Sequence, residues 1–397
     1  MLRGHHHALS WILAASVGLL SCSSAPPAPG TSREASGVGE PLPGVALGKD
    51  VWVGKGVLVQ NLTVFPVYAR DPRDVGDFTT LAKAIQLAKA EVREIGADGE
   101  GPRPMRGRDV RQEEEDEGAS ASARVDTLVI ENRGELPILI LAGTVVKGGK
   151  QDRQIGEDFV VPPKQTVDVS AFCVEQGRWD ASREGASTGG KFTAQATLAT
   201  GQVRAAGQYD KDQSAVWKNV ADANKAHDKQ SDSGTLLATL DDADVTAKRH
   251  ALSRAAAGVL ESAPDQARLV GLAYAVDGEV RGVRWFAGPK LFHLFQETLL
   301  ETAAFEAITS QAEARAAGKP SAPAVAAKED AVVSFTDDMM AAPVAETEAE
   351  AGQVRALKKS DKGYASELVI PEEPDAPKGK PKGKGKGSIT VDLFKKK

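Results

Sequence analysis

The sequence predicts an α+β fold: an antiparallel, β-rich N-terminal half packed with helices, a C-terminal hairpin and helix, and disordered tails. Three observations support this prediction. Apolar and β-branched runs typical of strands recur in the first half of the chain. Apolar residues then recur at helical spacing over 204–228 and 246–262. Finally, Asp277-Gly278 separates two apolar runs, and Pro289 follows them. Strands followed by helices are typical of α+β domains.

The hairpin is the clearest local element. Its strands are expected at Val270–Val276 and Glu279–Phe286, because Asp-Gly favours a two-residue turn. This register places Leu272 opposite Val283, and Tyr274 opposite Arg281. Proline suits the first turn of a helix, so a helix is predicted from Pro289. Its apolar stripe is Leu291, Leu294, Phe295, Leu299, Thr302 and Phe305.

Earlier elements are predicted from the same signals. Residues 56–65 have strand composition, and Pro66 either ends that strand or places it on an edge. Thr79 or Thr80 is expected to cap a helix that begins at Leu81. Further strands are predicted at Val125–Glu131, Pro137–Ala142, Asp158–Val161 and Thr166–Glu175.

The predicted domain covers residues 51–310 and carries a polar insert at 96–123. About 250 foldable residues are ample for a sizeable core. Residues 311–397 are rich in Ala, Glu, Pro, Lys and Gly, so this tail is predicted to be mostly disordered. Its end, Ser388–Phe394, has strand composition and would form a short strand on a partner or on the domain itself.

The N-terminus predicts export and lipidation. Residues 1–21 contain Arg3 and an apolar run of 13 residues, too short to span a bilayer, as in a signal peptide. Leu19-Leu20-Ser21-Cys22 resembles a bacterial lipobox, which implies lipid on Cys22 and a membrane anchor of several acyl chains. The alternative is an ordinary cleaved signal with an incidental cysteine.

Residues 22–50 are predicted to be a flexible tether because they are rich in Ser, Pro, Gly and Ala. Ser23 follows the cysteine where an aspartate would favour the inner membrane. By resemblance to the enterobacterial sorting rule, we expect the cell envelope, and the outer membrane before the inner one.

Composition limits the partners of the chain. A net charge of -6 gives no indication of nucleic-acid binding. With Cys22 lipidated, Cys173 has no partner for an intrachain disulfide. The tail nevertheless contains lysines at every second position that would bind an anionic envelope polymer: Lys378, Lys380, Lys382, Lys384 and Lys386.

The first candidate site is the Gly-rich segment that contains Lys150, Gln151 and Arg153. The Gly148-Gly149 pair between strands exposes backbone N–H groups beside cations, an arrangement that binds anions. It is not a Walker loop, because the required spacing is missing and no helix is predicted to start there. The alternative is a plain turn that leads into a charged strand.

The second candidate segment runs from Cys173 to Trp179 and contributes Glu175 and Arg178. Four residues separate Cys173 from Arg178, whereas the phosphate loop of cysteine phosphatases needs five, so a phosphatase is disfavoured. A free cysteine after an apolar strand is more often a buried small hydrophobe. His293 and Glu297, one helical turn apart, are at most half of a metal site; we predict no metal, no cofactor and no identified catalytic residue.

At these two segments the chain resembles a prokaryotic family, the ARG (ADP-ribosylglycohydrolase) and rhodanese-phosphatase-superfamily-associated protein domain. The matching pieces, over roughly 51–310, include Asn61–Val67, Phe78–Ala84, Glu131–Arg133, Gly149–Arg153 and Cys173–Trp179. The family is associated with NAD and ADP-ribose metabolism through genomic neighbourhood and domain fusion. The resemblance therefore implies a nucleotide-like or phosphorylated ligand, although export would remove this chain from the cytoplasmic NAD pool.

The leading expectation is a membrane-anchored lipoprotein whose domain binds a small anionic ligand, or a partner, through Lys150, Gln151, Arg153, Glu175 and Arg178. Two alternatives remain open: a hydrolase acting on a phosphorylated or ADP-ribose-like compound, and a structural envelope protein. If Arg153 and Arg178 share one site, their guanidinium groups must be exposed in the same cleft.

Overall fold

The computed structural model describes residues 43–94, 127–183, 186–319, 323–350, 352–370 and 387–396. All of these belong to one compact unit, Leu42–Lys397. The predicted signal peptide, Cys22, the acidic insert and the alternating lysines lie outside the described residues. Among the described helices, none is both long and apolar enough to cross a bilayer.

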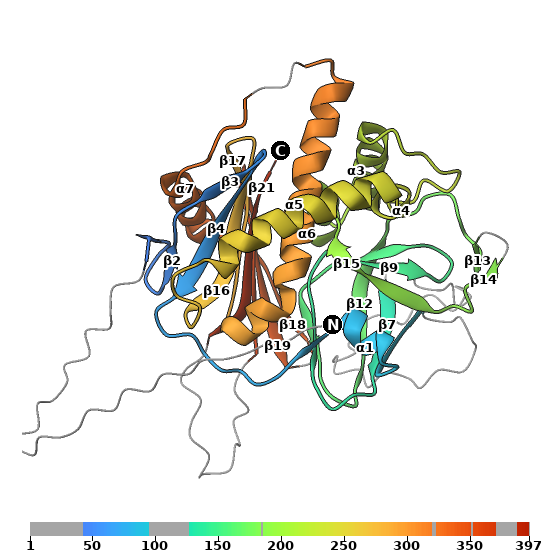
Figure 1. Cartoon of the computed structure of the whole chain (residues 1–397). Helices are drawn as coiled ribbons and strands as arrows, with labels where there is room; N and C mark the ends of the chain where they lie inside the picture. Colours follow the sequence, from blue (N-terminus) through green and yellow to red (C-terminus); the bar gives the residue numbers. More distant parts are fainter. Residues whose placement is uncertain are drawn as a thin grey trace, which may run out of the picture. The chain divides into compact units, whose positions relative to one another are not determined.

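A large antiparallel sheet forms one half of the unit (Figure 1). Its central strands are β4, β16 and β17, and the last of the described strands, β21, is inserted between β17 and β20. In spatial order the strands are β1 (Val45–Ala46), β2 (Val51–Val53), β4 (Leu62–Ala69), β16 (Leu269–Val276), β17 (Glu279–Phe286), β21 (Ser388–Lys395), β20 (Gly363–Val369), β19 (Gln353–Lys359) and β18 (Val344–Glu350), with β3 (Val57–Val59) also paired to β4.

Helices cover both faces of this sheet. Alternate residues of β16 point to opposite faces: Leu272 and Tyr274 pack with α6 (Pro289–Ala316), whereas Ala273 packs with α7 (Glu329–Ala341). Because both faces are covered, all residues of β16 are buried. α5 (Ala243–Glu261) packs along α6 on the first side.

A smaller barrel-like sheet forms the other half (Figure 1). A bridge between Arg93 and Lys191 brings its two edges together, so that the strands curve around their own apolar core. Its strands are, in spatial order, β15 (Phe192–Leu198), β9 (Thr144–Gly148), β10 (Arg153–Ile155), β12 (Thr166–Cys173), β7 (Thr127–Asn132) and β6 (Ala90–Glu94).

Shorter elements complete the unit. Thr80 caps α1 (Leu81–Gln86) by accepting a hydrogen bond from the Lys83 N–H, as predicted. The remaining elements are β5 (Thr79–Thr80), β8 (Ile138–Ile140), β11 (Phe159–Val161), β13 (Ser182–Arg183), β14 (Ala186–Ser187), α2 (Gly201–Gln208), α3 (Gln213–Ala226) and α4 (Leu237–Leu240).

The α+β fold class is confirmed, but the predicted domain end at residue 310 is wrong. Helix α6 continues to Ala316, and α7 with β18 to β21 follows within the predicted tail. Val332, Phe335 and Leu393 are buried in the core, so this part of the chain folds with the domain. Composition misled the prediction because the tail has few large apolar residues. These few residues are enough to fold it onto the domain, since each of its strands also pairs with a neighbouring strand.

Two local predictions also need correction. The strand after residue 56 does not end at Pro66, because β4 continues to Ala69. Pro66 lies where the pairing partner of β4 changes from β3 to β2. The hairpin turn is correct, but Arg281 forms a bulge: Tyr274 pairs with Gly282, one residue away from the predicted partner.

Candidate functional site

The structure brings the two predicted segments together, but it engages both predicted arginines in ion pairs. Arg153 is 3% exposed. Its guanidinium pairs with Glu94 at 3.1 Å, and its Nη1 donates to the Cys173 sulfur at 3.2 Å. Burial raises the pKa of the Cys173 thiol more than the nearby Arg153 charge lowers it. The environment therefore favours the neutral thiol.

Arg178 forms a separate set of ionic contacts and hydrogen bonds. Its Nη2 lies 2.7 Å from the Glu175 carboxylate and 3.6 Å from that of Asp152. Its Nη1 donates to the carbonyls of Gly149 at 2.7 Å and Asp180 at 2.9 Å. The Arg178 charge therefore ties segment 175–180 to the turn after β9. We call this set of contacts the Arg178 latch.

The other predicted site residues divide between interior and surface. The Gln151 side chain is fully buried and donates to the Glu175 carbonyl at 2.8 Å. Glu175 is also buried, and its carboxylate accepts the Asp152 N–H at 2.9 Å. Lys150 is exposed. Because the two guanidinium groups are buried in separate ion pairs, the predicted shared anion site of Arg153 and Arg178 is not formed.

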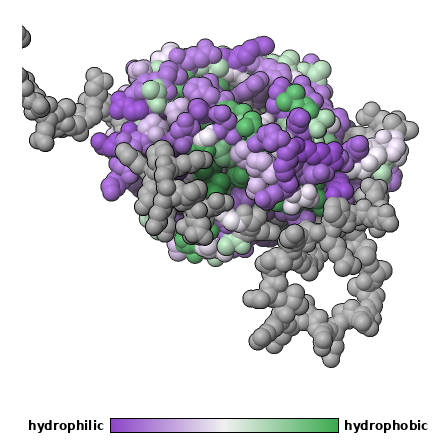
Figure 2. Space-filling view, turned by 90° about the horizontal axis from the view of Figure 1, so that it is seen from below, coloured by the Kyte–Doolittle hydropathy of each residue, from purple (hydrophilic) through white to green (hydrophobic). Residues whose placement is uncertain are grey.

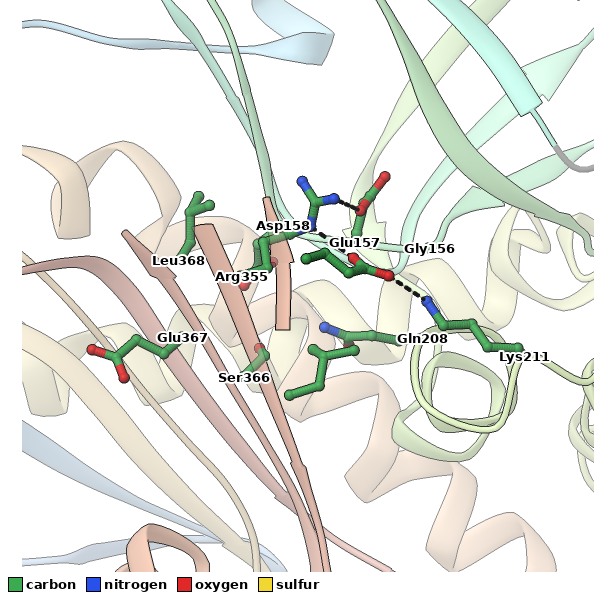
Figure 3. Close-up of a pocket in the computed structure, with 11 residues that line it drawn as sticks. Gly156, Glu157, Asp158, Gln208, Lys211, Arg355, Ser366, Glu367 and Leu368 are labelled. Atoms are coloured by element: carbon green, nitrogen blue, oxygen red, sulfur yellow. Dashed lines mark hydrogen bonds and ion pairs between the residues drawn. The ribbon is translucent and has the colours of Figure 1, made fainter. Parts of the chain in front are cut away.

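A second group of charges surrounds a small cavity where α2 and residues 156–158 meet strands β18–β20 (Figure 3). Arg355 pairs with Glu157 at 2.7 Å and with Glu348 at 3.1 Å. The Gln208 Oε1 atom has no hydrogen-bond partner among the described residues. A space of about 10 Å³ is open to the centre of a water molecule, which suits about one water.

A buried ionic network lies next to this cavity. Asp392 of β21 pairs with Arg204 at 2.9 Å and with Arg284, and Arg284 also contacts Asp158 at 3.2 Å. Burial acts to raise the pKa of Asp392, but the two arginines outweigh it and lower that pKa. Sequence analysis missed this network because its members lie up to 234 positions apart along the chain, from Asp158 to Asp392.

The larger cleft lies where α6 begins. Its walls are residues 72–76, Ala267 and Gly288–Leu291, and about 260 Å³ is open to the centre of a water molecule. Arg73 and Lys290 contribute cations. Lys290 pairs with the exposed Asp74 at 3.2 Å. Helix α6 begins on the lower side of Figure 1, the side that Figure 2 faces; that surface is mostly hydrophilic around a central apolar area.

Helix α6 leaves backbone donors at this cleft. Gly288 is the N-cap residue and provides no side-chain cap, and Pro289 occupies the first turn. The first N–H groups of a helix have no partner within it, and they carry the positive end of the helix dipole. The pKa of Asp74 is lowered by the Gly76 N–H and by Lys290. Asp77 also pairs with Lys290, at 3.4 Å, so two negative charges lie beside the two cations.

Among the described residues, no group of three or more His, Cys, Asp or Glu side chains could hold a metal ion. His293 does not pair with Glu297 in this structure; its Nδ1 lies 2.7 Å from the Pro289 carbonyl.

The family comparison agrees with the fold. The model of the ARG and Rhodanese-Phosphatase-superfamily-associated Protein domain matches residues 50–375, which is most of the chain. The chain belongs to this family. The match extends beyond the predicted boundary at 310 and includes α7 and strands β18–β20. No curated protein and no solved structure gave a match.

Proposed function

We propose that this protein is a lipid-anchored cell-envelope protein whose domain binds an anionic ligand in the cleft at the start of α6. One observation carries the ligand site: the cleft combines Arg73, Lys290 and the uncapped first turn of a 28-residue helix. Helix N-termini with free N–H groups favour phosphate and carboxylate groups. We therefore propose this cleft for the anionic ligand, in place of a site shared by Arg153 and Arg178.

The lysine-rich segment favours an anionic polymer as the ligand. Arg73 donates through Nη2 to the Ser388 carbonyl, and its guanidinium lies against Gly387. In the sequence, Gly387 directly follows the five alternating lysines that end at Lys386. The lysines themselves lie outside the described residues, but their segment joins the fold beside the cleft. A polymer with repeated negative groups matches this charge pattern.

Lipidation is tested by changing Cys22 to Ser. We expect Cys22→Ser to remain unprocessed or to leave the membrane fraction, because the thiol that accepts the lipid is lost. The measurement is fractionation of cells together with the apparent mass of the protein. If the variant still sediments with membranes at its mature size, the lipid anchor is wrong.

Ligand binding is tested with inorganic phosphate and inorganic polyphosphate in calorimetry. Lys290→Gln should weaken binding about ten- to a hundredfold, since a hydrogen bond to a charged group contributes about 1.5–3 kcal/mol. Asp74→Asn should strengthen it, because a negative charge leaves the cleft. The matched control is Lys218→Gln, which removes an exposed lysine paired with Asp222 on α3. Equal binding by the Lys290 and Lys218 variants would reject the cleft.

Two other functions remain candidates. A hydrolase of phosphorylated or ADP-ribose-like compounds is suggested by the family description alone. Incubation of the purified protein with ADP-ribose, followed by chromatography of the products, would decide it. A structural envelope role without a small ligand would be favoured if neither phosphate nor polyphosphate binds.

A further inference from the structure

We propose that Lys150 and Trp179 form a second binding site, distinct from the cleft of the proposed function, for a planar ring that carries a negative charge. Trp179 would stack on the ring, and the Lys150 ammonium would contact the anionic group. Lys150 lies two residues after the end of β9, and Trp179 lies three residues before β13; both strands are labelled in Figure 1.

The Arg178 latch draws together the backbone segments that carry these two residues. A single nitrogen, Arg178 Nη1, donates to the Gly149 carbonyl, which belongs to the peptide bond of Lys150. The same nitrogen donates to the Asp180 carbonyl, one residue beyond Trp179. Both backbone segments are thus fixed around one guanidinium. Such fixed geometry reduces the entropy lost when a ligand binds.

Trp179 is exposed although the segment that leads to it begins inside the fold. Cys173, Val174 and Glu175 are buried, and Arg178 forms the latch, but 56% of Trp179 is exposed. An indole held at the surface offers a flat apolar face, and stacking of a ring on an aromatic side chain is favourable.

Lys150 supplies the charge. Its side chain is exposed, and it forms no ion pair with any described residue. Two carboxylates of these segments have other partners: Glu94 pairs with Arg153 and accepts the Lys150 backbone N–H at 3.1 Å, and Asp180 accepts the Ser182 N–H at 2.7 Å. A ligand with both a ring and an anionic substituent can contact the indole and the ammonium together. It should therefore bind more tightly than a ligand that has only one of these two features.

The test measures binding of three probes to the full mature chain: AMP, ribose 5-phosphate and adenosine. AMP should bind at least about tenfold more tightly than either of the others, because only AMP has both ring and phosphate. Trp179→Ala should reduce AMP binding to the level of ribose 5-phosphate. Lys150→Ala should reduce it to the level of adenosine. Leu87→Ala, which removes another exposed apolar side chain, is the matched control.

Three results would overturn the proposal: no AMP binding at millimolar concentration, equal binding of AMP and ribose 5-phosphate, or an AMP affinity that Trp179→Ala leaves unchanged. Sedimentation velocity adds a fourth. If Trp179→Ala dissociates an oligomer, the indole is covered by protein. Lys290→Gln distinguishes the two sites, because it should leave the preference for AMP over ribose 5-phosphate intact.

Discussion

Deleting residues 388–397 should abolish the folded domain. This deletion removes β21 from between β17 and β20, and it divides the large sheet. Ile389, Val391, Leu393 and Phe394 leave the core, and each buried side chain of this size contributes roughly 1.5–3 kcal/mol. The sum is comparable with the whole stability of a typical domain, about 5–15 kcal/mol.

The same deletion removes Asp392 and leaves Arg204 and Arg284 buried with less compensating charge. Breaking a buried ion pair from one side costs about 3–5 kcal/mol. Circular dichroism and size-exclusion chromatography should show an unfolded or aggregated chain. A control that lacks only Lys396 and Lys397 should remain folded. A monomeric 388–397 deletion with an unchanged unfolding midpoint would contradict the role of β21.

Arg178→Ala should destabilise the domain by about 3–5 kcal/mol, because it leaves the Glu175 carboxylate buried and without its cation. It also leaves the Gly148 and Gly149 carbonyls without the guanidinium donor. The measurement is equilibrium unfolding in urea. This result is the opposite of that expected for a surface ligand site, where losing the arginine would leave stability almost unchanged.

The matched control is Arg254→Ala, which removes an exposed arginine from α5. Exposed substitutions usually change stability by less than about 0.5 kcal/mol. Should the two variants unfold at the same urea concentration, the latch would be unimportant for the fold.

Local signals in the sequence predicted local structure well. Asp277-Gly278 gave the hairpin turn, Pro289 gave the start of α6, and Thr80 gave the cap of α1. Each of these depends on residues within a few positions of one another. The bulge at Arg281 could not be predicted in this way, because it also depends on β4 and β21, which pair with the two strands of the hairpin.

The candidate site was harder to predict because burial is a property of the whole fold. Arg153 carries a charge, and charged residues are mostly exposed. Its partner Glu94 lies 59 residues earlier. Nothing near Arg153 in the sequence indicates that pairing. The alternating lysines and Trp179 are visible in the sequence. Their possible roles depend on the position of Gly387 beside Arg73 and on the contacts of Arg178, and both come only from the fold.

The position of β21 also constrains the order in which the chain folds. Many domains complete their N-terminal parts while the ribosome is still extending the chain. Here the strand between β17 and β20 follows every other described strand along the chain. The large sheet therefore cannot close until Ser388–Lys395 have been synthesised, so the N-terminal strands of that sheet wait for more than 300 further residues before their sheet is complete.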